Sequence, residues 1–260
     1  MSDTDQGKRD FLKGLGGFAV LVAAVWAATA LWPESDKDYS QEGPQSLVAL
    51  VSSDDRPEGH KVRDQYRHPL ETLTFFNLQP EMKVVEIFPG GPGGFYRRII
   101  EPYIEGAGKG GAYYPVNGGI GWPVEQVEDL PYGEIDMALV FRAHGFLIYG
   151  DPAQDHVNDL FKMLKPGGYL GIVDHAGDEN IPQDPEAESG YINASYFRAM
   201  AEKAGFEFVK ESDVNRNPKD TKDHPDGLYS LPPSLRSGDE DKYRAIGESD
   251  RFTHLYRKPL

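Results

Sequence analysis

Four closely spaced glycines mark the stretch of this chain whose residues best suit ligand binding. They lie between the apolar segment 84–88 and a helical pattern in residues 95–104, at Gly90, Gly91, Gly93 and Gly94. A strand, a glycine turn and a helix in succession place free backbone N–H groups and a helix N-terminus against a bound ligand. Glu86, near the end of the strand, can accept hydrogen bonds from that ligand. The sequence therefore predicts a nucleotide-type ligand site at this turn.

The same turn is also compatible with a bend that binds nothing. The dinucleotide fingerprint G-x-G-x-x-G is not met, because Phe95 and Tyr96 stand where its last glycine would fall. The phosphate-loop pattern G-x-x-x-x-G-K-S/T is absent as well, since Lys109 is followed by Gly110 and belongs to the turn after the helix. Neither standard phosphate-binding pattern therefore supports the site.

Two histidines and an aspartate are the candidates for acid–base chemistry. His144 follows the apolar segment 135–141, and Asp174 and His175 follow the apolar segment 169–173. Histidine titrates near neutral pH, so either ring can act as a base, and Asp174 can orient His175 or accept a proton. The alternative is that both histidines only cap loop backbone. Histidine and carboxylate also ligate metals, but no short ligand spacing supports a metal site, and we predict none.

A pair of opposite charges ahead of the glycine turn has two interpretations. Asp64 and Arg67 precede the segment 84–88 by fewer than 25 residues. Either they reach over the predicted site, or they form an ion pair on the surface. The sequence leaves both possibilities open.

The elements that must position these residues alternate between strand and helix. Strands are expected at 84–88, 111–116, 135–141, 169–173, 206–211 and 251–257. Helices are expected at 45–53, 95–104, 122–130, 155–164 and 193–204, and within 62–78, where His68-Pro69 is the expected helix entry. This alternation predicts an α/β fold with a mainly parallel sheet covered on both faces. The last two strands have no helix between them and are expected to pair antiparallel at one edge.

Ligands of such sheets bind beyond the carboxyl ends of the parallel strands. The polar residues expected on that rim are Glu86, Asn117, Arg142, His144, Asp174 and His175. Residues 213–250 are polar, contain four prolines and are too long for an ordinary connection, so they form a functional lid or are partly disordered.

At residues 164–175, LKPGGYLGIVDH, the chain resembles the class I S-adenosylmethionine-dependent methyltransferases. Its end, AGFEFVKES followed by an insertion and RFTHLYRKP, is similar to the last two strands of that superfamily. RHPLETLTFF, VVEIFPGG and YRKP also occur in this order in a group of predicted, often exported, methyltransferase-like proteins. The resemblance covers about residues 60–260. It implies a doubly wound, seven-stranded-type sheet, S-adenosylmethionine as cofactor and methyl transfer to a small-molecule acceptor.

The resemblance carries over to individual residues only in part. Glu86 matches the acid of the family's first motif, and Gly90 matches a glycine that lets the backbone approach the methionine part of the cofactor. Phe88 and Pro92 stand where the family has its first and third glycines. Asn117 is the nearest polar candidate for the acid that holds the ribose. The chain that follows is short, which predicts a shortened or missing third strand.

Three functions are compatible with these observations. The first is a methyltransferase with His144, His175 and Asp174 as catalytic residues and a cofactor site at Glu86, Gly90, Gly91, Gly93, Asn117 and Arg142. The second is a non-catalytic envelope binding protein that keeps a degenerate methyltransferase fold, which the altered first motif favours. The third, a nicotinamide oxidoreductase, is disfavoured by the failed fingerprint.

Composition and the first residues indicate location and partners. A formal net charge of −15 argues against a nucleic-acid partner, and the absence of cysteine excludes disulfides and thiolate chemistry. Lys8 and Arg9 precede the uncharged segment 14–32, as in a twin-arginine signal peptide with one lysine, and 28–30 offers a cleavage site. We expect a signal or membrane anchor at 1–32, a linker with a short helix at 33–59, and a periplasmic or exported domain at 60–260.

Overall fold

The computed structural model describes residues 43, 45–116, 129–148 and 153–260. The chain divides into the units Met1–Asp38 and Tyr39–Leu260, and every described residue belongs to the second unit. The segments predicted as signal or anchor and as the helix at 122–130 fall wholly or largely outside the described residues. Within the described ranges, every helix is too short or too polar to cross a bilayer.

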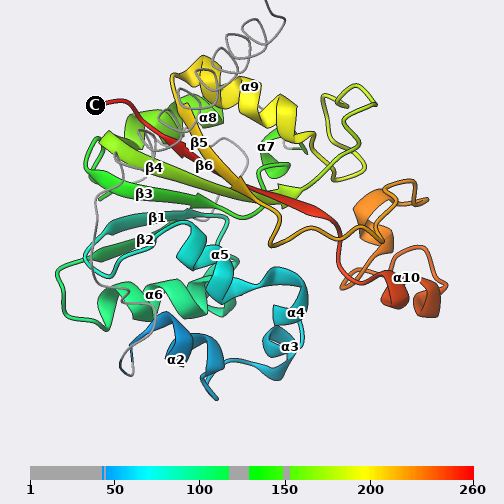
Figure 1. Cartoon of the computed structure of the whole chain (residues 1–260), viewed down its shortest axis with the longest axis horizontal. Coiled ribbons are helices and arrows are strands. Elements are labelled where there is room, and N and C mark those ends of the chain that lie inside the picture. Colours follow the sequence, from blue (N-terminus) through cyan, green and yellow to red (C-terminus); the bar gives the residue numbers. More distant parts are fainter. Residues whose placement is uncertain (1–42, 44, 117–128, 149–152) are drawn as a thin grey trace, which may run out of the picture. The chain divides into compact units, whose positions relative to one another are not determined.

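One six-stranded sheet organises the domain (Figure 1). Its strands are β1 (Lys83–Ile87), β2 (Ala112–Val116), β3 (Ile135–Val140), β4 (Leu164–His175), β5 (Glu207–Ser212) and β6 (Arg251–Arg257). The spatial order is β2-β1-β3-β4-β6-β5, and the first four strands are parallel. β6 runs antiparallel to both β4 and β5. The predicted mainly parallel α/β sheet with an antiparallel pair at one edge is confirmed.

Helices precede the sheet and also connect its strands. They are α2 (Leu47–Ser52), α3 (Glu58–Lys61), α4 (Asp64–Arg67), α5 (Pro69–Phe75), α6 (Arg97–Glu105), α7 (Gly145–Ile148), α8 (Ala153–Met163), α9 (Ala194–Ala204) and α10 (Glu240–Ile246), with 3-10 turns η1 (Gly91–Gly93) and η3 (Gly227–Ser230). The helix entry expected at His68-Pro69 is confirmed, because α5 begins at Pro69 directly after His68. His68 takes the left-handed conformation, with φ 37°, and separates α4 from α5, because the residue before a proline is disfavoured in the α-helical region.

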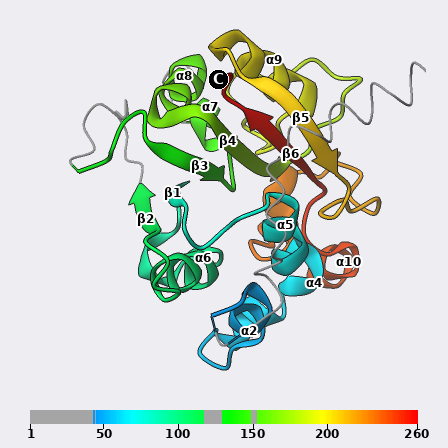
Figure 2. The same cartoon turned by 60° about the vertical axis from the view of Figure 1, so that its left-hand side comes forward.

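Helices cover both faces of the sheet, and Figure 2 shows α8 and α9 on one side and α5 and α6 on the other. Because successive side chains of a strand point to opposite faces, Val85 and Ile87 pack into the core cluster that includes residues of α8 and α9. On the other face, a Cβ on Gly171 of β4 would lie 3.0 Å from the ring of Phe76, which shows how closely the end of α5 approaches the sheet.

The strand β4 begins earlier than expected. A strand is expected from residue 169, but β4 already begins at Leu164. Its register against β3 shifts between Ile135 and Met137. Gly167 has φ 78°, so a glycine lets the chain turn within the strand and continue in a shifted register.

Residues 213–250, predicted as a lid or insertion, contain η3 and α10 and are joined to the sheet by buried polar contacts. Asp220 is 4% exposed and accepts hydrogen bonds from the Tyr191 hydroxyl at 2.9 Å and from the backbone N–H of Asp250 at 2.8 Å. Asp220 thus joins the middle of the segment to the residue that directly precedes β6 and to Tyr191. The residues just before β6 therefore have defined positions near the sheet's rim.

Candidate functional site

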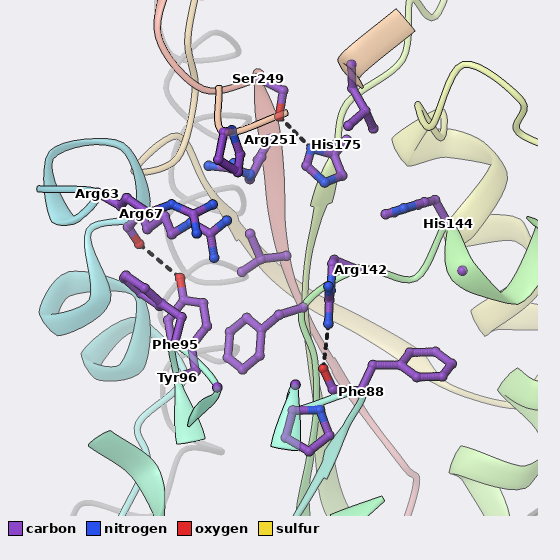
Figure 3. A pocket seen from close by; sticks show the side chains of 18 of the residues that line it. Arg63, Arg67, Phe88, Phe95, Tyr96, Arg142, His144, His175, Ser249 and Arg251 are labelled. Atoms are coloured by element: carbon purple, nitrogen blue, oxygen red, sulfur yellow. Dashed lines mark hydrogen bonds between the residues drawn. The ribbon is translucent and has the colours of Figure 1, made fainter. Parts of the chain in front are cut away.

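A cavity of about 600 Å³ lies at the carboxyl ends of the parallel strands (Figure 3). Its walls come from β1 and the glycine bend, from the ends of β3 and β4, from α3 and α4, and from the segment 213–250. Six of the predicted site residues line it: Glu86, Gly90, Gly93, Arg142, His144 and His175. Gly91 and Asp174 do not line it, and Asn117 lies outside the described residues.

The glycine bend is shaped by left-handed backbone conformations. Phe88 has φ 55°, Gly90 has φ 80° and Gly91 has φ 69°. A phenylalanine thus adopts the conformation that glycine favours, at a cost of about 1 kcal/mol. A Cβ on Gly94 would lie 1.6 Å from the carbonyl oxygen of Pro89, so only glycine allows the bend to close there. The bend therefore keeps a glycine-like course although its first position is a phenylalanine.

Glu86 is a buried carboxyl group with a single hydrogen-bonding side chain in the described structure. It is 2% exposed, and the Tyr113 hydroxyl donates to its Oε2 at 2.6 Å. Burial raises the pKa of Glu86, the Tyr113 hydrogen bond and the charge of Arg142 lower it, and the resulting pKa is about 7. At neutral pH this carboxyl lies near its midpoint. A ligand that donates hydrogen bonds or carries positive charge would shift it to the ionised form.

Arg142 joins the ends of two strands at the cavity. It follows β3, and its Nη2 donates to the carbonyl oxygen of Phe88 at 2.7 Å (Figure 3). This contact holds the first residue of the bend against the neighbouring strand. Its sequence-predicted place on the ligand rim agrees with the cavity lining.

Asp174 positions His144, not its neighbour His175. Its Oδ1 lies 2.9 Å from His144 Nδ1 and accepts from the backbone N–H of His175 at 2.7 Å, while its Oδ2 accepts from the backbone N–H of His144 at 2.5 Å. Among the described residues, the His175 ring bonds to the Ser249 hydroxyl and not to this carboxylate. The interpretation in which Asp174 orients His175 is corrected accordingly.

His175 is held by Ser249. Its Nδ1 lies 2.5 Å from the Ser249 hydroxyl, and its ring meets the His144 ring edge to face at 5.0 Å between centroids. Burial, then the charges of His144 and Arg251, lower the pKa of His175 well below its ordinary value. The ring is therefore neutral at neutral pH and able to accept a hydrogen bond.

These three residues are also the described residues best placed to hold a metal ion. One ligand atom from each of His144, Asp174 and His175 lies within 4.8 Å of the others. Both Asp174 oxygens also accept hydrogen bonds from backbone N–H groups, as metal-ligating carboxylates commonly do.

A cluster of three arginines forms another part of the wall. Arg63, Arg67 and Arg251 all line the cavity and all bond to Glu248, which is 2% exposed. Arg63 Nε donates to Glu248 Oε1 at 2.5 Å, Arg67 Nε donates to Oε2 at 2.9 Å, and Arg251 Nη2 donates to Oε2. Burial would raise the pKa of Glu248, but the three arginines outweigh it and lower that pKa to about 2.

Of this cluster, only Arg67 is a candidate from the sequence alone. Its suggested partner, Asp64, bonds instead to both Nη atoms of Arg56 at 2.7 Å. Arg63 and Arg67 lie four residues apart and so share one helix face, which is a signal that could have linked them. The contribution of Glu248 and Arg251 comes from the far end of the chain.

Several methyltransferases are among the similar solved structures. A SAM-dependent methyltransferase from Aquifex aeolicus is 16% identical, with a TM-score of 0.48 and coverage of 84% of this chain and 99% of that one. Phosphoethanolamine N-methyltransferase 2 of Haemonchus contortus, in complex with S-adenosyl-L-methionine, is 14% identical, with a TM-score of 0.45 and coverage of 87% and 60%. An S-adenosylmethionine-dependent methyltransferase from Mesorhizobium loti is 12% identical, with a TM-score of 0.40 and coverage of 73% and 97%.

At identities of this order the likeness is one of fold. No protein-family model matches the chain, and no curated protein sequence matches it. What the site can do therefore rests on its own residues.

Proposed function

We propose that this protein binds S-adenosylmethionine and catalyses methyl transfer to a small-molecule acceptor. The observation that carries the proposal is the open cavity above Glu86 and the glycine bend, at the rim where sheets of this kind bind ligands. Its volume of about 600 Å³ is in the usual range of small-molecule sites.

The residues at the bend suit this cofactor. An added Cβ at Gly93 would meet nothing within 4 Å, and one at Gly90 would meet only the Cα of Gly94 at 3.4 Å, so the backbone that lines the cavity there is bare toward a ligand. The ligand's ammonium group and ribose hydroxyls donate hydrogen bonds, and a buried carboxyl such as Glu86 can accept them. Asn117, which directly follows β2 in the sequence, is the proposed contact of the ribose.

The cofactor would supply a methyl group on a positively charged sulfur, and the protein's residues would position the acceptor and exclude water. His144, fixed by Asp174, and His175, fixed by Ser249, are the candidates to take a proton from the acceptor. Arg142 would hold the bend in its binding conformation through the Phe88 carbonyl.

Calorimetry on the full chain with S-adenosylmethionine, S-adenosylhomocysteine and NAD tests the proposal. We expect micromolar or tighter binding of the first two and none of NAD. Absence of binding by all three would overturn the proposal in favour of a protein that keeps the fold without the cofactor. A methyltransferase assay with candidate acceptors then separates an enzyme from a binding protein.

A glycine substitution locates the site. Gly90→Val should weaken S-adenosylhomocysteine binding by at least 10-fold, because a β-branched side chain would stand where backbone and ligand touch. Gly108→Val is a matched control, since Gly108 also has positive φ and open space around it but does not line the cavity. Equal binding by the two variants, measured by calorimetry, would show that the site is misplaced.

Export through the signal or membrane anchor at residues 1–32 stays a prediction. Cell fractionation with a tagged full chain tests it, and a twin-arginine pathway mutant of the host tests the route. Recovery of the protein in the cytosol of both strains would contradict it.

A further inference from the structure

The geometry points to a subsite for an anionic group, a carboxylate or a phosphate, formed by Arg63, Arg67 and Arg251. If methyl transfer is the reaction, as proposed above, this subsite defines the acceptor as an acid. It rests on that function for its role, but binding of an anion can be measured without it.

The arginine cluster carries an excess of positive charge. Three guanidinium groups share one carboxylate, Glu248, so the cluster carries two uncompensated positive charges at the cavity wall. The whole chain has a formal net charge of −15, so composition alone does not favour such a basic cluster. Cations withdrawn from water without a full complement of counter-charge are costly, and a bound anion removes that cost.

Two of the arginines have guanidinium donors that are available to a ligand. Arg63 and Arg67 each bond to Glu248 through Nε, and their Nη atoms make no hydrogen bond within the described part of the chain. Figure 3 shows both side chains reaching from the region of α4 toward the cavity. A guanidinium presents its donors in a planar fork that matches carboxylate and phosphate oxygens. The two forks are therefore available for a ligand while Glu248 fixes their orientation.

The arginine side chains are restrained by their neighbours. The Arg67 guanidinium lies 4.8 Å from the centroid of the Phe95 ring, and the Tyr96 hydroxyl donates to the Arg67 carbonyl oxygen at 3.0 Å. Arg251 also donates through Nη1 to the carbonyl oxygen of Tyr66 at 3.2 Å. Side chains restrained in this way lose little entropy when a ligand binds, which is how selective sites are prepared.

The position of the cluster assigns it to the acceptor. Arg251 pairs in register with His175 across β4 and β6, and Ser249, two residues earlier, holds the His175 ring. An acid group bound by the arginines would thus place the rest of its molecule beside His175. The cluster and the candidate base are built from the same short stretch of chain.

Binding of simple anions tests the subsite. Inorganic phosphate and succinate are titrated into the full-length protein by calorimetry, in chloride buffer of constant ionic strength. We expect Arg67→Gln to weaken binding by at least 10-fold and Arg63→Gln by about 5-fold. Arg244→Gln is the matched control, because Arg244 also pairs with a glutamate but is exposed and lies outside the cavity.

Circular dichroism and thermal unfolding establish that each variant is folded, and Arg63→Gln provides the test if Arg67→Gln is not. Equal anion binding by Arg63→Gln, Arg67→Gln and Arg244→Gln would overturn the subsite. Retention of phosphate or succinate binding at saturating S-adenosylhomocysteine supports assignment to the acceptor. Loss of it would overturn that assignment, because the arginines would then hold the cofactor's own carboxylate.

The two proposals fail in different ways. Anion binding without S-adenosylhomocysteine binding would leave the arginine subsite standing and overturn the proposed function. S-adenosylhomocysteine binding without binding of phosphate or succinate would overturn the subsite alone.

Discussion

Two buried glutamates belong to this site, and they behave in opposite ways. Glu86 lines the cavity beside the glycine bend, and Glu248 lies behind the arginines, each 2% exposed. The pKa of Glu86 is raised to about 7, whereas that of Glu248 is lowered to about 2. Burial alone raises the pKa of both carboxyls. The difference comes from their partners, a tyrosine hydroxyl for Glu86 and three arginines for Glu248.

The two carboxyls therefore have different roles: Glu86 is placed to bind a ligand, and Glu248 supports the arginines. Glu248 is fully paired and orients cations that themselves face the cavity, so its charge is satisfied without a ligand. Glu86 has one neutral partner, so its ionised form is completed only when a ligand arrives. A buried carboxyl with a pKa near 7 is the more informative sign of a binding site.

The largest effect is expected from removal of the charge of Glu248. Glu248→Gln should lower the free energy of unfolding at pH 7 by about 3–5 kcal/mol, because it leaves three arginines without their counter-charge. Urea unfolding measures this. Glu240→Gln, at an exposed ion pair with Arg244, is the control and should change stability by less than about 1 kcal/mol.

The pH dependence gives a second measure of the same group. Because the folded pKa of Glu248 lies below its ordinary value, its stabilisation is present above pH 4.5 and is lost as the pH falls toward 2. Wild type should lose on the order of 3 kcal/mol more than Glu248→Gln over that range. If the free energy of unfolding changes with pH in the same way in both proteins, Glu248 is not the source of this pH dependence.

Glu86→Gln should remove a pH dependence of the opposite sign. The folded pKa of Glu86 lies above its ordinary value, so its favourable contribution is present below pH 4.5 and is lost as the pH rises through about 7. Urea unfolding between pH 4.5 and 8 should show a fall on the order of 3 kcal/mol in wild type that is missing in the variant.

The same variant should bind S-adenosylhomocysteine at least 10-fold more weakly, since an amide cannot take up the negative charge that the ligand favours. Unchanged affinity, with the altered pH profile, would show that Glu86 is a buried structural carboxyl and does not contact the ligand.

A smaller effect is expected from Tyr113→Phe. It removes the hydrogen bond that lowers the pKa of Glu86, so the midpoint of the stability change should move above pH 7. The loss of one hydrogen bond should cost about 1 kcal/mol. Unfolding at several pH values measures both, and an unmoved midpoint would mean that other groups set this pKa.

Arg63→Gln is expected to have the smallest effect on stability. Its side chain is 22% exposed, and Arg67 and Arg251 remain to pair with Glu248. The free energy of unfolding should fall by less than about 1 kcal/mol. A loss as large as that of Glu248→Gln would show that the arginines do not share the carboxylate as the distances indicate.

The strands and most helices of this fold could be predicted from sequence because each depends on local apolar periodicity. The apolar segments at Val84 and at Ile135 became β1 and β3 within about one residue. Glu86, Arg142, His144 and His175 converge on one cavity because the carboxyl ends of parallel strands share an edge. Side-chain pairing was harder, since nothing in the order DH at 174–175 indicates that Asp174 bonds to His144.

By itself, the sequence determined the sheet, the glycine bend and the rim on which Glu86 and the histidines lie, because these follow from periodicity and backbone conformation. Only the tertiary structure decided the arginine cluster. β6 runs antiparallel, so Arg251, at its beginning, lies on the same rim as the ends of the parallel strands, where it meets Glu248, Arg63 and Arg67. Contacts between residues more than 180 positions apart depend on the place of β6 between β4 and β5, which local pattern does not encode.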